Sequence, residues 1–191
     1  MLALALAISL LQGAPQEQPP SEDFELLPKE AAPDPAALQR QKELEAKLSL
    51  RRRMLQLHQL GGFLTLGSMS LAVIFGQLDY MDKYGGRGDT GNFHQWHRWT
   101  AYGSAAIFAA TGALAVFAPS PLEKPLRLDT ATLHKAAMAT ATAAMAAEVV
   151  LGIVTGSREG RLSQRDFALA HQIIGYTALV ATFAGFTVLT F

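Results

Sequence analysis

Four long apolar runs constrain the fold of this chain more than any other feature of its sequence. They cover approximately residues 54–78, 96–118, 131–155 and 167–191. Each run has the twenty or so mostly apolar residues that a bilayer-spanning helix requires. None has the polar stripe that a helix of a soluble bundle shows. The sequence therefore predicts an all-α integral membrane protein, with an up-down-up-down four-helix bundle over residues 54–191.

The segment before the first apolar run has a different composition. Residues 2–11 are apolar but too short to span a bilayer. No lysine or arginine precedes them, although a signal peptide usually has one. Residues 1–14 are therefore interpreted either as a signal peptide or as a short apolar leader. Residues 15–37 are rich in proline and acidic side chains and predict an exposed linker.

A charged helix is predicted between this linker and the first apolar run. Asp34 followed by Pro35 is typical of a helix N-cap and the first helical position. Residues 38–53 are highly charged and continue without a break into the apolar run. We expect this segment to lie as a helix at the membrane surface.

Charge and cysteine content exclude several classes of function. The formal net charge is zero, and nucleic-acid binding requires a basic face. The chain has no cysteine. This excludes disulfides, iron–sulfur clusters, thiolate ligation of haem and covalent haem attachment. A redox cofactor would have to be held by histidine, methionine or a carboxylate.

Four of the five histidines lie near the N-terminal ends of the four apolar runs. They are His58, His97, His134 and His171, and they are almost evenly spaced along the chain. Because successive helices run in opposite directions, His58 and His134 lie on one membrane side, here called side A. His97 and His171 lie on the other side, side B. Each pair comes from diagonal helices and can hold a planar macrocycle, with one imidazole on each face of the metal.

Small residues continue the helix faces that begin at these histidines. Eighteen residues make five turns, so Gly76 lies on the face of His58 and Gly152 on the face of His134. Glycines at these positions would make room for the edge of a second haem. We therefore predict two non-covalent b-type haems, with four glycines contributing to the binding sites: Gly62, Gly76, Gly152 and Gly175.

Bulky residues of the first run fall away from the face of His58. They are expected to face lipid or neighbouring helices, and include Phe63, Leu64, Leu71 and Ile74. A bundle filled only by side chains needs large residues inside. Small inward faces indicate either very close helices or another group in the interior.

His94 is an alternative ligand to His97, since the two lie one turn apart. An aromatic residue follows His58 and His171 at the fifth position, and Tyr102 has the same place after His97. This shared phase favours His97 and leaves His94 at the membrane surface. The separation of His58 from His134 nearly equals that of His97 from His171, which suggests a duplicated helical hairpin.

Glu148 is the one carboxylate deep within an apolar run. Ionisable residues inside membranes are costly and usually functional. Glu148 lies on the face of His134, towards side B. Three roles fit this position: a hydrogen bond to a ligand histidine, uptake of a proton coupled to reduction, or an ion pair with Arg158.

The alternation of His58, His97, His134 and His171 over residues 55–191 resembles the cytochrome b561 family. That family has a four-helix core with two b haems, each bound by histidines from alternate helices. The resemblance implies that these four histidines are axial ligands and that the chain transfers electrons across a membrane. It also implies a donor and an acceptor such as an ascorbate-like reductant, a quinone, ferric iron or a redox protein.

Two other functions fit the same residues. One is a haem-bearing, quinone-reactive anchor subunit of a larger oxidoreductase. The other is a haem-free structural or transport subunit, in which the histidines only link helices. We predict no catalytic residue and no nucleic-acid partner. We expect the lipid bilayer to be that of a bacterial inner (cytoplasmic) membrane, with the chain either in a larger complex or as a homodimer.

Overall fold

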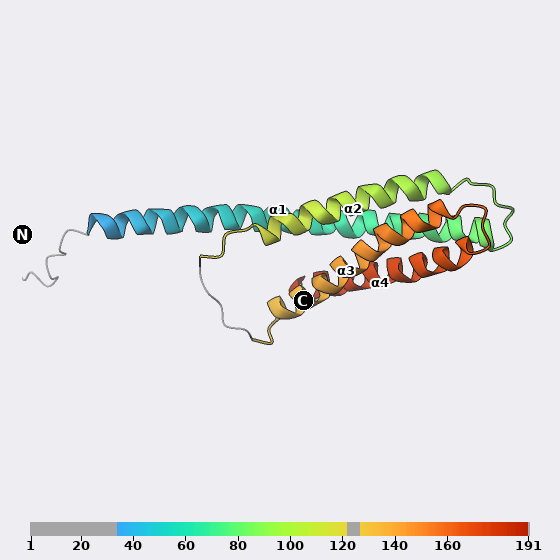
Figure 1. Ribbon diagram of the computed structural model, residues 1–191. Helices are drawn as coiled ribbons and strands as arrows, with labels where there is room; N and C mark the ends of the chain where they lie inside the picture. Colours follow the sequence, from blue (N-terminus) through green and yellow to red (C-terminus); the bar gives the residue numbers. More distant parts are fainter. Residues whose placement is uncertain (1–33, 122–126, 191) are drawn as a thin grey trace, which may run out of the picture. The chain divides into compact units, whose positions relative to one another are not determined.

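The computed structural model describes residues 34–121 and 127–190. Four α-helices follow one another along the chain (Figure 1): α1 Pro35–Tyr84, α2 His94–Val116, α3 Thr130–Ser157 and α4 Gln164–Thr190. The described residues include no strand. All four helices are long enough and apolar enough to cross a membrane. The predicted all-α, four-span membrane fold is confirmed.

The chain divides into two units, Met1–Arg40 and Gln41–Phe191, at a boundary inside α1. In the first unit, the Asp34 carboxylate accepts a hydrogen bond of 3.0 Å from the backbone N–H of Ala36. Helix α1 begins at Pro35, so the predicted capped start is confirmed.

Residues 35–37, predicted as the end of the linker, belong to α1 instead. The capping carboxylate and the proline start the helix before the charged sequence does. The predicted leader, residues 1–14, and the linker up to residue 33 lie outside the described residues.

The helices and the apolar runs that predicted them do not end at the same residues: all four helices begin before their runs and α1 and α3 also end after them, whereas α2 ends at Val116, two residues before the end of its run. Helix α1 continues from the charged segment to Tyr84, well past the end of the first run at residue 78. An apolar run marks only the part of a helix that lies in the hydrocarbon layer. The helical hydrogen bonding of the backbone continues into the polar residues beyond it, until a residue interrupts the helix. In α1 the helix is interrupted at Gly86, whose φ of 79° is left-handed.

Contacts in the second unit make α1 and α4 antiparallel. The ring of Phe63, in the first half of the apolar part of α1, lies 4.9 Å from that of Phe186 near the end of α4. At the opposite end, the side chain of Gln77 accepts hydrogen bonds from Gln172 and Tyr176 near the start of α4. Near the first end, Arg51 donates to the carbonyl of Pro119, just after α2. These contacts fit the predicted up-down-up-down topology.

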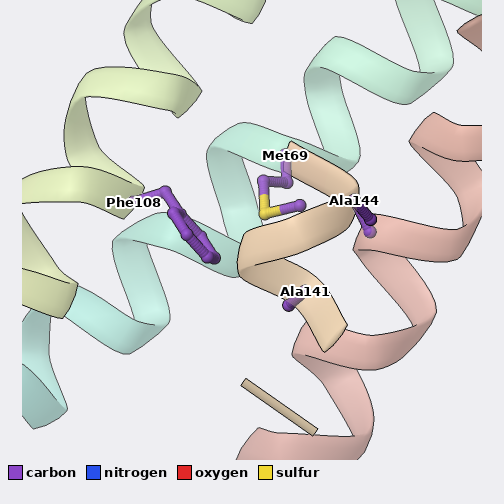
Figure 2. Close-up of a cluster of buried hydrophobic side chains, with 5 residues drawn as sticks. Met69, Phe108, Ala141 and Ala144 are labelled. Atoms are coloured by element: carbon purple, nitrogen blue, oxygen red, sulfur yellow. The ribbon is translucent and has the colours of Figure 1, made fainter. Parts of the chain in front are cut away.

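The core is built largely from small side chains. All four helices contribute to its central cluster, which consists of Met69, Phe108, Ala141, Ala144 and Ala178. Figure 2 labels the first four of these residues. Of the eight buried hydrophobic residues in the described ranges, six are alanines. The interior of the second unit therefore has little side-chain bulk of its own.

The inward and outward faces of α1 follow the sequence pattern. Thr65, Met69 and Ala72, on the face of His58, are buried. The four bulky residues expected to point outward are at least half exposed: Phe63, Leu64, Leu71 and Ile74. The prediction that small residues face inward and bulky ones outward is confirmed for this helix.

Candidate functional site

The structure brings the four histidines together in two pairs. The rings of His58 on α1 and His134 on α3 have centres 6.1 Å apart and planes at 89°. The rings of His97 on α2 and His171 on α4 have centres 5.9 Å apart and planes at 70°. These are the two diagonal pairs that alternation of the helices predicts.

The two pairs lie near opposite ends of the spanning helices. His97 contacts α1 at Ala72 and Gly76, which follow His58 by about four and five helical turns. At a pitch of about 5.4 Å, these positions are about 21 to 27 Å further along the helix axis. This separation approaches the thickness of a bilayer's hydrocarbon core, about 30 Å.

On side A, both imidazoles donate to backbone carbonyls of the neighbouring helix. His58 Nδ1 lies 2.8 Å from the carbonyl oxygen of Thr111. His134 Nδ1 lies 2.8 Å from the carbonyl oxygen of Gly185. Because a carbonyl can only accept, Nδ1 must carry the proton in each ring, which leaves Nε2 with a free lone pair. This is the tautomer that ligates metals through Nε2.

On side B, the two histidines have different partners. His97 Nδ1 lies 3.0 Å from the carbonyl oxygen of Ala72. His171 Nδ1 lies 3.1 Å from Glu148 Oε2, with the two side chains 18% and 20% exposed. The distance suits a hydrogen bond, yet both buried atoms lack a partner of good hydrogen-bond geometry. The pair is close but misaligned.

Glu148 is not joined to Arg158, the ion-pair partner that the sequence offered. The Arg158 guanidinium donates to the hydroxyl of Ser163 at 3.2 Å and lies 5.0 Å from the ring centre of Phe167. Of the three predicted roles of Glu148, the contacts in the structure favour a hydrogen bond to a histidine, here His171.

Two of the predicted glycines lie against imidazole rings. A Cβ added at Gly76 would come within 2.8 Å of His97 Cε1, and one at Gly152 within 3.2 Å of His171 Cε1. Both glycines were predicted to make room for the edge of a haem, and the protein atoms nearest to them belong to histidine side chains. The missing side chain at each position lets α2 or α4 place its imidazole inside the bundle.

The other two predicted glycines have different neighbours. A Cβ at Gly175 would lie 2.7 Å from Glu148 Oε1. A Cβ at Gly62 would lie in ordinary contact with Phe186, at 3.9 Å. Gly175 therefore makes room for the carboxylate, and the structure gives Gly62 no comparable constraint.

His94 belongs to neither imidazole pair. Its Nδ1 lies 3.4 Å from Asp79 Oδ2, and its side chain is 57% exposed. The ring opposite His171 is that of His97. The geometry thus favours His97 over His94 as a ligand. The sequence favours the same residue, because an aromatic residue follows His97 at the fifth position, as it does His58 and His171.

The spacing within each pair suits a metal held between two imidazoles. A ligated imidazole nitrogen lies about 2 Å from its metal and the ring centre about 1 Å behind it, so two imidazoles that hold one metal between them would have ring centres about 6 Å apart. The observed values are 5.9 and 6.1 Å. Among the described residues, no three histidines, cysteines or carboxylates gather around one point. Two imidazoles alone fit a metal whose other ligands come from a macrocycle.

Sequence reasoning missed two polar clusters near side B. Gln77 joins α1 to α4 through Gln172, the residue after His171, and through Tyr176. Asp82 is 4% exposed and accepts hydrogen bonds from the hydroxyl of Thr90 and the backbone N–H of Gly91. Polar residues near the ends of apolar runs were the available signal, but sequence alone does not pair them.

Comparisons with known proteins do not add a functional assignment. No protein-family profile matches the chain, and no match was found among curated proteins or solved structures. The function of the chain is therefore inferred from its membrane-spanning fold and from the geometry of the histidine pairs.

Proposed function

We propose that this chain is a membrane cytochrome that holds two b-type haems and transfers electrons across a bilayer. The observation that carries the proposal is the pairing of four histidines, His58 with His134 and His97 with His171, at ring separations of 6.1 and 5.9 Å. The pairs lie near opposite ends of helices long enough to cross a membrane.

In this proposal, each histidine would hold a haem iron through its Nε2. At His58, His97 and His134, the Nδ1–H is held by a carbonyl of a neighbouring helix. These hydrogen bonds fix the ring orientation and the tautomer, and they make the ligating nitrogen more basic. A haem bound through two imidazoles supplies one-electron transfer without an open position for oxygen or substrate.

The alanine-rich interior supports the presence of a bound group. Buried hydrophobic residues of the described ranges are mostly alanines, and none of the large side chains there is fully buried. A bundle that excludes water without a cofactor needs bulkier side chains inside. Two flat macrocycles between the helices would supply the missing apolar contacts.

Resemblance to the cytochrome b561 family extends the proposal to partners. The donor and acceptor would be a small reductant, a quinone, ferric iron or a redox protein that meets the chain at the two membrane surfaces. A bacterial cytoplasmic membrane is the location that fits this function. The haem-bearing anchor subunit differs only in having a larger complex as one of these partners.

Haem content tests the proposal directly. The full chain, produced in a haem-replete host and purified in detergent, is expected to contain two protohaems by the pyridine haemochrome assay. The oxidised and reduced spectra should be those of low-spin, six-coordinate haem, because both axial positions are filled. A folded but colourless preparation would instead support the haem-free structural or transport subunit and refute the cytochrome.

A further inference from the structure

The two helical hairpins, α1–α2 and α3–α4, repeat one another's histidine contacts on side A. His58 donates to the carbonyl of Thr111, and His134 donates to the carbonyl of Gly185. The two donors are separated along the chain by nearly the same length as the two acceptors. The same contact is therefore made at equivalent positions of both hairpins.

The repeat extends to side B in the same register. Gly76 lies against the ring of His97, and Gly152 lies against the ring of His171. The sequence separation of the two glycines equals that of His58 and His134, the donors on the same two helices. Both hairpins thus place the second histidine over a glycine of the first helix.

One contact breaks this equivalence. Ala72 and Glu148 each lie one turn before the glycine of their helix, so they occupy the same position in their hairpins. The Nδ1–H of His97 donates to the backbone carbonyl of Ala72. At His171, Nδ1 lies 3.1 Å from the side-chain carboxyl of Glu148. One of the four imidazoles therefore has an acidic side chain where the other three have a neutral carbonyl.

A second substitution between the hairpins makes room for this carboxyl group. Gly175 follows His171 by one turn, as Ala101 follows His97, so these two positions are equivalent. A Cβ at Gly175 would lie 2.7 Å from Glu148 Oε1. The larger side chain at Glu148 is thus matched by the loss of a methyl group at Gly175, whereas the first hairpin has alanine at both places. The two differences together form one unit.

We propose that Glu148 is a positioning residue that accepts the Nδ1–H of His171 and lowers the reduction potential of the haem held by His97 and His171. This inference rests on the proposed function. A carboxylate acceptor makes an imidazole a stronger donor to its metal than a carbonyl does. Stronger donation and the added negative charge both stabilise the oxidised, more positive iron.

Burial of the Glu148 and His171 side chains supports this assignment. Glu148 Oε2 and His171 Nδ1 are both buried without a well-aligned partner, and unpaired buried polar atoms are costly. The two atoms are already within hydrogen-bond distance, at 3.1 Å, so only the orientation of the groups has to change to align them. Ligation at Nε2 would fix the ring in one such orientation.

A redox titration of the detergent-purified holoprotein tests the proposal. Glu148→Gln keeps the shape and an acceptor oxygen but removes the charge. It is expected to retain two haems and to raise the midpoint potential of one of them by at least about 59 mV, a tenfold change in the one-electron equilibrium constant. The other midpoint should not move. Gly175→Ala should give a rise of the same sign, because the added methyl displaces the carboxylate.

Glu159→Gln is the matched control. Glu159 is a carboxylate on the same membrane side, 75% exposed and 3.4 Å from Lys83 Nζ, and its loss should leave both midpoints unchanged. A Glu148→Gln protein with two haems and unchanged midpoints would overturn the inference but leave the cytochrome proposal standing. If Glu148→Gln binds only one haem, Glu148→Asp, which keeps the charge, must bind two. An Asp variant with one haem would likewise overturn it, since packing alone would then explain the position.

Discussion

At the scale of single residues, the site is defined by which nitrogen of each imidazole is engaged. Carbonyl oxygens hold Nδ1 of His58, His97 and His134, so the tautomer is set by backbone rather than by side chains. Every residue of a chain carries such an acceptor. The paired histidines therefore carry no sequence signature beyond their own spacing.

Gly76 offers the clearest single-residue prediction. Gly76→Ala is expected to cost one haem, because the new methyl would lie 2.8 Å from His97 Cε1 and push the ring out of place. Haem content and the visible spectrum would measure the loss. Gly67→Ala, on the same helix, has open space around the added Cβ. It should keep both haems and gain stability of about 0.5 to 1 kcal/mol from helix propensity.

Retention of two haems with unchanged spectra in Gly76→Ala would mean that His97 is not held against this glycine in the loaded protein. The sequence identified Gly76 because it lies five turns from His58 on the same face. It did not reveal that the neighbour would be an imidazole. That contact depends on how closely α2 approaches α1. The pattern of residues along one helix does not give the distance between two helices.

At the scale of elements, the helix faces and the capped start of α1 were predictable from the sequence, whereas the end of α1 was not. The inward position of Thr65, Met69 and Ala72 follows from counting along one helix from His58. The end of α1 at Tyr84 depends instead on Gly86 and on polar residues that remain helical outside the apolar layer. Polar residues such as Asp79 and Asp82 end the apolar run, although the helix continues through them. The end predicted from hydropathy therefore lies before the observed end of α1.

The loop over residues 85–93 is held by one buried carboxylate. Asp82 accepts hydrogen bonds of 3.0 and 3.1 Å from the Thr90 hydroxyl and of 2.9 Å from the Gly91 N–H. Asp82→Ala is expected to destabilise the protein by about 1 to 3 kcal/mol, because the donors lose a charged acceptor in a buried place. Faster amide hydrogen exchange should be confined first to residues 85–93.

Arg87→Ala is the control for this prediction, since Arg87 is an exposed residue of the same loop. It should leave stability and exchange unchanged. Equal protection of the loop in Asp82→Ala and in the unaltered protein would show that the carboxylate does not organise it. Because α2 begins at His94 directly after this loop, the anchoring also fixes where His97 enters the bundle.

At the scale of the whole molecule, two similar hairpins place two similar sites at opposite membrane surfaces. The nearly constant sequence separation between equivalent contacts fits a duplicated hairpin. This repetition, together with the antiparallel order of the helices, is why the diagonal pairing could be predicted from the sequence. The repeat could not predict the different acceptors of the two side B histidines, which are the backbone carbonyl of Ala72 and the carboxylate of Glu148. The two hairpins differ at these equivalent positions.

If the proposed function holds, electron transfer across the bilayer requires both histidine pairs, which gives a prediction for the assembled molecule. His134→Ala removes one ligand of the side A pair and leaves the His97–His171 pair, so the purified variant should contain one haem. In sealed vesicles with an impermeant reductant outside and an impermeant oxidant inside, the native chain should oxidise the external reductant steadily. The variant should react no faster than protein-free vesicles, because about 20 Å of hydrocarbon then separates the remaining site from the far surface.

His94→Ala, which alters the exposed histidine beside Asp79, should retain two haems and the native rate. A one-haem His134→Ala protein that still carried electrons at the native rate would show that the two sites do not act in series.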